Sequence, residues 1–149
     1  MKFTCTIEIY KPKDKVAELF VNPKYLKEYQ DGFISKELLE GTEGHNEAKS
    51  KMIYKMGKNQ MVITETILEN NLPDSFFANY HHKHMDNTML CRFESIDDNT
   101  TKYISEINYT AFRGFVPKAL AYLFPSMFKK QVKKWLVNFK NYAERNEAN

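Results

Sequence analysis

Long hydrophobic runs, cysteine, glycine and proline are all scarce in this sequence. No apolar segment approaches the roughly 18 residues of a membrane-spanning helix. Two cysteines in 149 residues are too few for a disulfide-based scaffold, and five glycines with five prolines argue against a disordered chain. The net charge of +3 is too small to indicate binding of nucleic acid. What remains is an ordinary globular protein, and the length predicts one domain over residues 1–149.

The two cysteines, Cys5 and Cys91, lie within alternating apolar patterns and not in loops. Free cysteines are commonly buried, so we expect two reduced core residues that do not pair with each other. No signal segment opens the chain, which favours a cytoplasmic location. Nucleotide-binding glycine motifs, serine nucleophile motifs and zinc-protease motifs are missing too, and nothing calls for a cofactor.

Aromatic residues are abundant, with 11 Phe and 9 Tyr, and the first part of the chain shows two kinds of periodicity. Residues 2–10 alternate between apolar and polar, which predicts a half-buried strand. Two short helices are expected next, because Pro12 and Pro23 suit first helical positions and apolar residues follow each at helical spacing. Asp31-Gly32 ends the second helix.

Between Gly32 and Phe112 the chain has no helical period and instead consists of strand-length segments separated by turn residues. Asp86-Asn87 is expected to be one of these turns. Strands joined by such short connections must be antiparallel neighbours. Six strands are predicted in this way: 33–40, 48–56, 60–69, 75–84, 88–96 and 100–112.

The last segment predicts an amphipathic helix of roughly 25 residues. Pro125 falls inside it and leaves two alternatives: a kink, or a short helix that ends near Phe124 and a long helix that begins at Pro125. Apolar residues recur at spacings of three and four, and lysines occupy the opposite face. The apolar stripe consists of Leu120, Leu123, Phe124, Phe128, Val132, Trp135, Leu136, Phe139 and Tyr142.

These elements predict an α+β helix-grip fold, in which a seven-stranded curved antiparallel sheet wraps around the long C-terminal helix. Seven strands at about 4.8 Å spacing span roughly 30 Å. A helix is only about 10 Å across, so one helix cannot fill the concave side of the sheet. The remaining space must hold large side chains, the two short helices or a ligand, and we expect a pocket there.

The order of elements resembles the START-like superfamily, which includes lipid-transfer domains, birch-pollen-allergen-like proteins and polyketide cyclases. The stretches that carry the resemblance are 3–10, the segment Pro12 to Phe20 followed by Asn22-Pro23, and the terminal helix around 135–140. The resemblance covers the whole chain in topology. It implies the fold and a cavity for a hydrophobic ligand, and it implies no particular reaction.

Candidate pocket residues come from the central strands and the last helix. Tyr80 and His82 could orient a ligand, Glu65 or Glu106 could act as a general base if one faced the pocket, and methionines could line an adaptable cavity. His82 and His84 could share a metal, but no further ligand is spaced to complete a site, so none is expected. The expected apolar contacts are Ile63, Ile107, Leu120, Phe128, Val132, Trp135 and Phe139, and the methionine group is Met52, Met56, Met61, Met85 and Met89.

Charge is unevenly distributed: segment 113–149 carries eight Lys or Arg residues and only two Glu residues. The basic face of the last helix is either simply solvated or makes weak contact with an anionic membrane surface or an acidic partner. Three functions fit the whole pattern. The first is binding of an apolar small molecule (lipid-, sterol- or polyketide-like), the second is a cyclase-type enzyme, and the third is a ligand-free interaction module.

Overall fold

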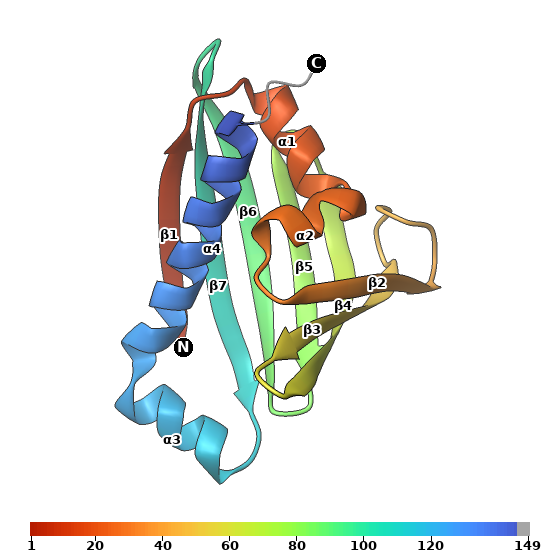
Figure 1. Cartoon of the computed structure of the whole chain (residues 1–149), viewed down its shortest axis with the longest axis vertical. Coiled ribbons are helices and arrows are strands. Elements are labelled where there is room, and N and C mark those ends of the chain that lie inside the picture. Colours follow the sequence, from red (N-terminus) through yellow and green to blue (C-terminus); the bar gives the residue numbers. More distant parts are fainter. Residues whose placement is uncertain (146–149) are drawn as a thin grey trace.

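The computed structural model describes residues 1–145 and contains one seven-stranded antiparallel sheet. The strand order is β1-β7-β6-β5-β4-β3-β2, so the first strand of the chain pairs with the last (Figure 1). Every other pair consists of strands that are consecutive in the sequence. The strands are β1 (Lys2–Ile9), β2 (Phe33–Glu40), β3 (Lys49–Met56), β4 (Asn59–Asn71), β5 (Ser75–His82), β6 (Met85–Asp97) and β7 (Thr100–Phe112).

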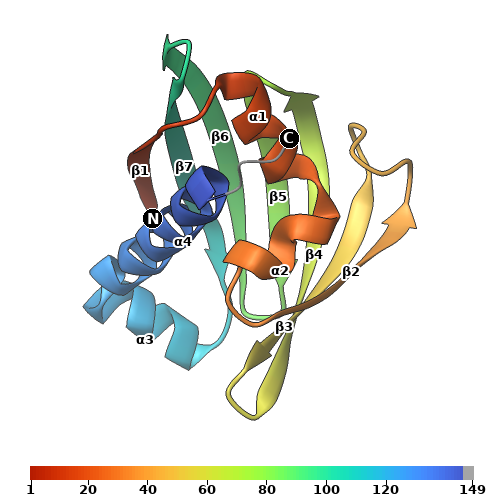
Figure 2. The ribbon, with the colours of Figure 1, turned by 45° about the horizontal axis from the view of Figure 1, so that its top comes forward.

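The helices lie on the concave side of this curved sheet (Figures 1 and 2). The long helix α4 runs along β1 and β7. The short helices α1 and α2 cover the part of the sheet that lies beside the C-terminal half of α4. The predicted helix-grip architecture, with short helices after the first strand, is therefore confirmed. The helices are α1 (Lys13–Val21), the 3-10 turn η1 (Pro23–Tyr25), α2 (Leu26–Tyr29), α3 (Phe115–Leu123) and α4 (Pro125–Arg145).

Pro125 begins a new helix, which is the second of the two arrangements that the sequence left open. Phe124 interrupts the helical path with φ −132° and ψ 54°, and its N–H donates to the Leu120 carbonyl over 2.8 Å. A proline lacks an N–H and is well tolerated in the first turn of a helix, so α4 starts there without losing a bond. The alternative of a short helix followed by a long one is therefore confirmed, as α3 and α4.

The turn between β5 and β6 differs from the prediction. It lies at Lys83 and His84, while Asp86 and Asn87, expected to form the turn, belong to β6. Asp86 is held by side chains from two other segments, because Arg113 donates to both of its carboxylate oxygens over 2.9 Å and His81 approaches within 2.6 Å. These side-chain contacts outweigh the local turn preference of an Asp-Asn pair.

Aromatic rings fill the concave side beneath α1 and α2. Phe20 is central to this cluster and meets Phe93 at 5.3 Å, Phe76 at 5.5 Å and Phe139 at 6.1 Å between ring centroids. All three arrangements are edge-to-face, which is the favoured geometry for aromatic pairs. Part of the space that one helix cannot fill is therefore occupied by the protein itself.

Both cysteines are free and buried, as expected. Cys5 on β1 and Cys91 on β6 each pair in register with Ser105 of the intervening strand β7. The backbones of the two cysteines are thus two strand spacings apart, or about 9.6 Å. Across residues 1–145, no helix is long and apolar enough to cross a bilayer.

Candidate functional site

A cavity of about 250 Å³ lies between the sheet and α4, beside the aromatic cluster. Its walls come from strands β2 to β7, from α4 and from the segment around α2. Most of the lining side chains are apolar or aromatic. Among them are Phe20, Tyr29, Met52, Tyr54, Met61, Ile63, Ile67, Phe76, Tyr80, Met85, Met89, Tyr103, Ile107, Tyr109, Val132, Trp135, Leu136 and Phe139.

The periodicities of the elements determine which residues face the cavity. Successive side chains of a strand alternate between faces, so one set of alternate residues on β4 points inward. This set is Met61, Ile63, Glu65 and Ile67, and on β7 it is Tyr103, Ser105, Ile107 and Tyr109. Helical spacing of three and four brings Val132, Trp135, Leu136 and Phe139 of α4 to the same space.

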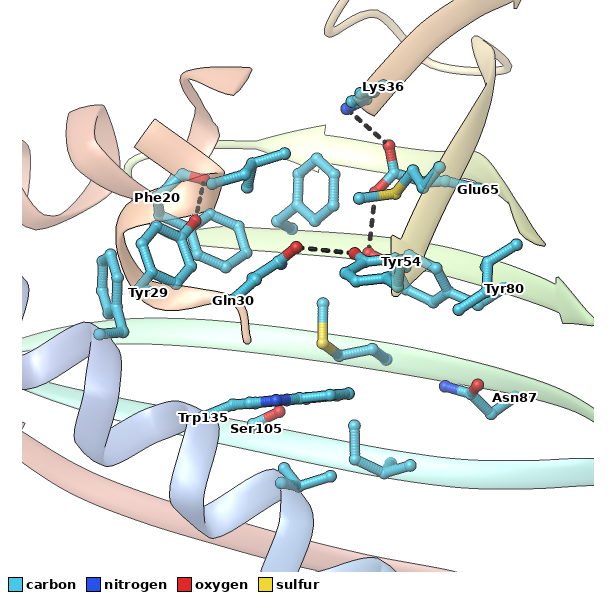
Figure 3. A pocket seen from close by; sticks show the side chains of 18 of the residues that line it. Phe20, Tyr29, Gln30, Lys36, Tyr54, Glu65, Tyr80, Asn87, Ser105 and Trp135 are labelled. Carbon is cyan, nitrogen blue, oxygen red and sulfur yellow. Dashed lines mark hydrogen bonds and ion pairs between the residues drawn. The ribbon is translucent and has the colours of Figure 1, made fainter. Parts of the chain in front are cut away.

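One carboxylate, that of Glu65, is buried in the wall of this cavity (Figure 3). The Tyr80 hydroxyl donates to Glu65 Oε2 over 2.9 Å, from the residue directly opposite on β5. Lys36 Nζ lies 2.9 Å from Oε1 as an ion pair, and both side chains of the pair are almost fully buried. Oε1 accepts no well-aligned hydrogen bond from residues 1–145, so Lys36 acts there mainly as a compensating charge.

Two tyrosine hydroxyls of the cavity, those of Tyr80 and Tyr54, are already used as donors. Burial, together with the Glu65 charge, raises the pKa of Tyr80 well above its usual value, so Tyr80 keeps its proton and donates it to Glu65. The Tyr54 hydroxyl donates in the same way to Gln30 Oε1 over 2.7 Å. A hydroxyl that donates its single hydrogen can still accept, so both oxygens can receive a hydrogen bond from a ligand.

Trp135 offers a hydrogen-bond donor to a ligand, where the tyrosine oxygens offer acceptors. Its indole Nε1 is buried and finds no hydrogen-bond acceptor within residues 1–145. The indole ring itself lines the cavity (Figure 3). A buried donor that lacks an acceptor costs about 1–3 kcal/mol, and an acceptor on a bound molecule would relieve that cost.

His82 lies at another part of the cavity wall, near the β5–β6 turn. Burial and the neighbouring His84, Lys83 and Arg113 lower the pKa of His82 below its ordinary value, so the ring is neutral at neutral pH. The rings of His82 and His84 are 5.4 Å apart. No group of three or more His, Cys, Asp or Glu side chains that could hold a metal ion occurs in the part of the chain that the structure describes.

Seven of the ten residues proposed from the sequence as ligand contacts line the cavity. They are Tyr80, His82, Ile63, Ile107, Val132, Trp135 and Phe139. Four of the five methionines considered as lining also lie there, whereas Met56 is 56% exposed.

Glu106, Leu120 and Phe128 are not in the cavity wall. Glu106 alternates with the inward residues of β7 and therefore points to the convex face, where Arg92 lies 3.0 Å from its carboxylate. Leu120 belongs to α3, which Pro125 separates from the cavity-facing stripe of α4. Phe128 packs edge-on against Tyr109 and Phe112 instead.

Lys36 and Gln30 are site residues that the sequence did not reveal. Lys36 lies opposite Met52, which in turn lies opposite Ile63, so the strand register places all three on one face. The alternation of β4 alone could have placed Glu65 beside Ile63 and Ile67. No local pattern indicates that Gln30, at the end of α2, reaches the cavity.

No family model and no curated protein sequence matches this chain. Solved structures do match it over nearly the full length. The ZhuI aromatase/cyclase from Streptomyces sp. R1128 has a TM-score of 0.81 at 12% identity, covering 99% of this chain and 96% of that one.

Two further matches are similar in extent. A START superfamily protein from Mycobacterium smegmatis has a TM-score of 0.80 at 7% identity, covering 97% of each chain. Ara h 8.0201 has a TM-score of 0.74 at 11% identity, covering 98% of this chain and 99% of that one. The chain therefore has the START-like fold that its sequence pattern resembles, and at these identities the likeness concerns the fold alone.

Proposed function

We propose that this protein binds an apolar small molecule, lipid-, sterol- or polyketide-like, between the sheet and α4. The observation that carries this proposal is the cavity of about 250 Å³ with its largely apolar wall. That volume, about 250 Å³, lies slightly below the roughly 300–1,000 Å³ typical of ligand pockets, which favours a small ligand. Burial of ligand surface contributes about 25 cal/mol per Å², from which the ordering costs of association are subtracted.

The polar atoms of the wall narrow the class of ligand. Trp135 Nε1 supplies a donor, and the Tyr80 hydroxyl oxygen supplies an acceptor. A ligand hydroxyl could accept from Trp135 or donate to Tyr80, whereas a ligand carbonyl could only accept from Trp135. The preferred ligand is thus an apolar skeleton with at least one oxygen, placed against Trp135 or Tyr80, with His82 as a further neutral contact.

The test begins with native mass spectrometry of the protein purified from its own host, followed by solvent extraction of any bound molecule. A stoichiometric apolar molecule would support the proposal and name the ligand class. A ligand-free mass, with no uptake of candidate lipids, sterols or polyketides, would contradict it and favour the interaction module.

Titration of the extracted molecule gives a second readout, because Trp135 is the single tryptophan of the chain and its ring lines the cavity. Binding is expected to shift its fluorescence. Ile63→Phe adds volume inside the cavity and should weaken binding at least about tenfold. Val62→Phe is the matched control, because Val62 is the next residue on β4 and is 45% exposed on the other face.

A cyclase-type enzyme is the second candidate, and Glu65 is the observation that favours it. A buried carboxylate beside an apolar cavity could take a proton from a bound substrate, with Tyr80 and Lys36 positioning it. Glu65→Gln separates the two candidates. A carrier variant would still bind and release the same molecule, whereas an enzyme variant would bind substrate without converting it to product.

A further inference from the structure

We propose that α3 and the start of α4 form a docking surface for an anionic lipid bilayer. The surface, called here the α3 tip, consists of Phe115, Val116, Tyr122, Leu123, Phe124 and Met127. This inference is independent of what occupies the cavity. It also differs from the sequence-based alternative, in which the basic face of the long helix makes the contact.

The α3 tip is an exposed apolar patch. No residue of α3 is buried, and Phe115 and Tyr122 are each 86% exposed. Val116, Leu123 and Phe124 are exposed by more than half. Spacings of one, four, seven and eight from Phe115 place Val116, Ala119, Tyr122 and Leu123 on one face of the helix. A contiguous apolar face of this kind marks an interaction site and not a packing surface.

The chemistry around the tip matches a negatively charged surface. From Ile107 to Ala143 the sequence contains no Asp or Glu. Lys118, Lys129 and Lys130 lie on α3 and the first turns of α4, and none of them has an ion-pair partner among residues 1–145. Lysines that flank an apolar tip are attracted to anionic lipid headgroups while aromatic side chains such as Tyr122 settle at the interface.

The place of α3 in the fold also suits this role. Figure 1 shows α3 at one end of the molecule, next to the end of β7 and below the start of α4. Arg113, immediately before α3, donates to the carbonyls of His82 and Lys83, so the helix is anchored at the β5–β6 turn. His82 and Met85 of this region line the cavity. A bilayer at the α3 tip would therefore lie close to that end of the cavity.

A second copy of the chain is a poorer occupant. A symmetric dimer through the α3 tip would use the same patch on both copies. Lys118, Lys129 and Lys130 of one copy would then face the same lysines of the other, and no Asp or Glu occurs between Ile107 and Ala143 in the sequence to offset the repulsion. An anionic bilayer removes the same apolar area from water and attracts those charges.

The test is co-sedimentation of the protein with vesicles made of equal parts phosphatidylcholine and phosphatidylglycerol, or of phosphatidylcholine alone. We expect binding to the mixed vesicles that falls as salt is raised. The double variant Phe115→Asp/Tyr122→Asp should reduce partitioning about tenfold or more. Ile96→Asp is its control, because Ile96 is 50% exposed near the β6–β7 turn at the other end of the sheet.

The charge contribution is tested by changing Lys118, Lys129 and Lys130 together to Gln. The matched triple variant changes the exposed Lys27, Lys55 and Lys58 to Gln and has the same net charge. Loss of vesicle binding in the Lys118, Lys129 and Lys130 variant, but not in the matched variant, supports the proposal. Equal loss in both, unchanged binding in the tip variant, or failure of the wild type to bind would overturn it. A dimer that Tyr122→Asp dissociates, without vesicle binding, would also overturn it.

Discussion

Glu65 and Lys36 form a buried ion pair whose partners come from different strands, β4 and β2. Only 6% of the Glu65 side chain and 11% of the Lys36 side chain are exposed. Such a pair adds little net stability, because desolvation of the two charges offsets their attraction. Its value is that it places a carboxylate and a tyrosine hydroxyl in the wall of a largely apolar cavity.

Removal of one partner is expected to be costly. Lys36→Met leaves the Glu65 charge buried and uncompensated, and should lower the free energy of unfolding by about 3–5 kcal/mol. The double variant Lys36→Met/Glu65→Gln should recover part of this loss, which urea denaturation can measure. Lys51→Met is the matched control: its partner Glu37 is 3.7 Å away at the surface, and the expected loss is below about 1 kcal/mol. Equal losses of unfolding free energy in Lys36→Met and Lys51→Met would contradict the role of Lys36 as the charge that compensates buried Glu65.

His82 should make stability depend on pH. Its pKa in the folded protein is lowered, first by burial and then by the nearby His84, Lys83 and Arg113, relative to about 6.5 in the unfolded chain. The unfolded chain therefore binds more protons between the two values. The contribution of neutral His82 to the free energy of unfolding is complete above pH 6.5. It is lost as the pH falls through the folded-state pKa.

NMR titration of the His82 ring should give a pKa below 6.5. His82→Gln should weaken the decline of the free energy of unfolding between neutral and mildly acidic pH. A folded-state pKa above that of the unfolded chain would refute this reading of the site.

At the level of elements, the corner between α2 and β2 depends on Gly32. This residue has φ +77°, and its carbonyl accepts a 2.7 Å hydrogen bond from the Lys55 N–H on β3. A Cβ at this position would lie 2.5 Å from the Lys55 carbonyl oxygen. Only glycine allows the chain to leave α2 and pass this close to β3, and the same corner brings Gln30 to Tyr54.

Two glycine variants separate close approach from backbone strain. Gly57 has φ +61°, but a Cβ there would meet no atom within 4 Å. Gly57→Ala should therefore cost only the strain of the left-handed conformation, about 1–2 kcal/mol. Gly32→Ala carries the same strain plus a backbone clash, and should lower the free energy of unfolding by about 1–3 kcal/mol more. Thermal unfolding of the two variants checks the difference, and similar melting temperatures would disprove the clash.

For the whole molecule, the main feature is that both ends of the chain share one core. β1 pairs with β7 along its full length, and α4 packs against β1. Phe20 of α1 and Phe139 of α4 belong to the same aromatic cluster. These contacts join the two ends of the described chain, so we expect residues 1–145 to unfold together.

Unfolding in urea is accordingly expected to be a single two-state transition. Trp135 fluorescence reports the contact between α4 and the cavity, and far-UV circular dichroism reports the sheet and helices. The two curves should coincide after normalisation. A fluorescence midpoint at clearly lower urea would instead show that α4 detaches from the sheet before the sheet unfolds.

Much of the site was accessible from the sequence, and the failures have identifiable causes. Helical spacing on α4 indicated that Val132 and Trp135 share one apolar face, whereas alternation on β4 did not decide which face lines the cavity, because apolar residues occur on both of its faces. On β7 the apolar residues occur on both faces, so alternation did not decide that Glu106 points outward. The turn at Lys83-His84 was missed because Asp86 is held by Arg113 from the far end of β7.

The sequence by itself determined the element types, their order and the need for a curved sheet around one helix, since these depend on local periodicity and on the sizes of the elements. Only the tertiary structure decided which polar side chains meet in the wall of the cavity. Lys36 reaches Glu65 only because β2, β3 and β4 pair in one particular register, and that register is set by contacts between strands. Tertiary structure also decided that the α3 tip is exposed, because an apolar helix is buried or exposed according to what packs against it.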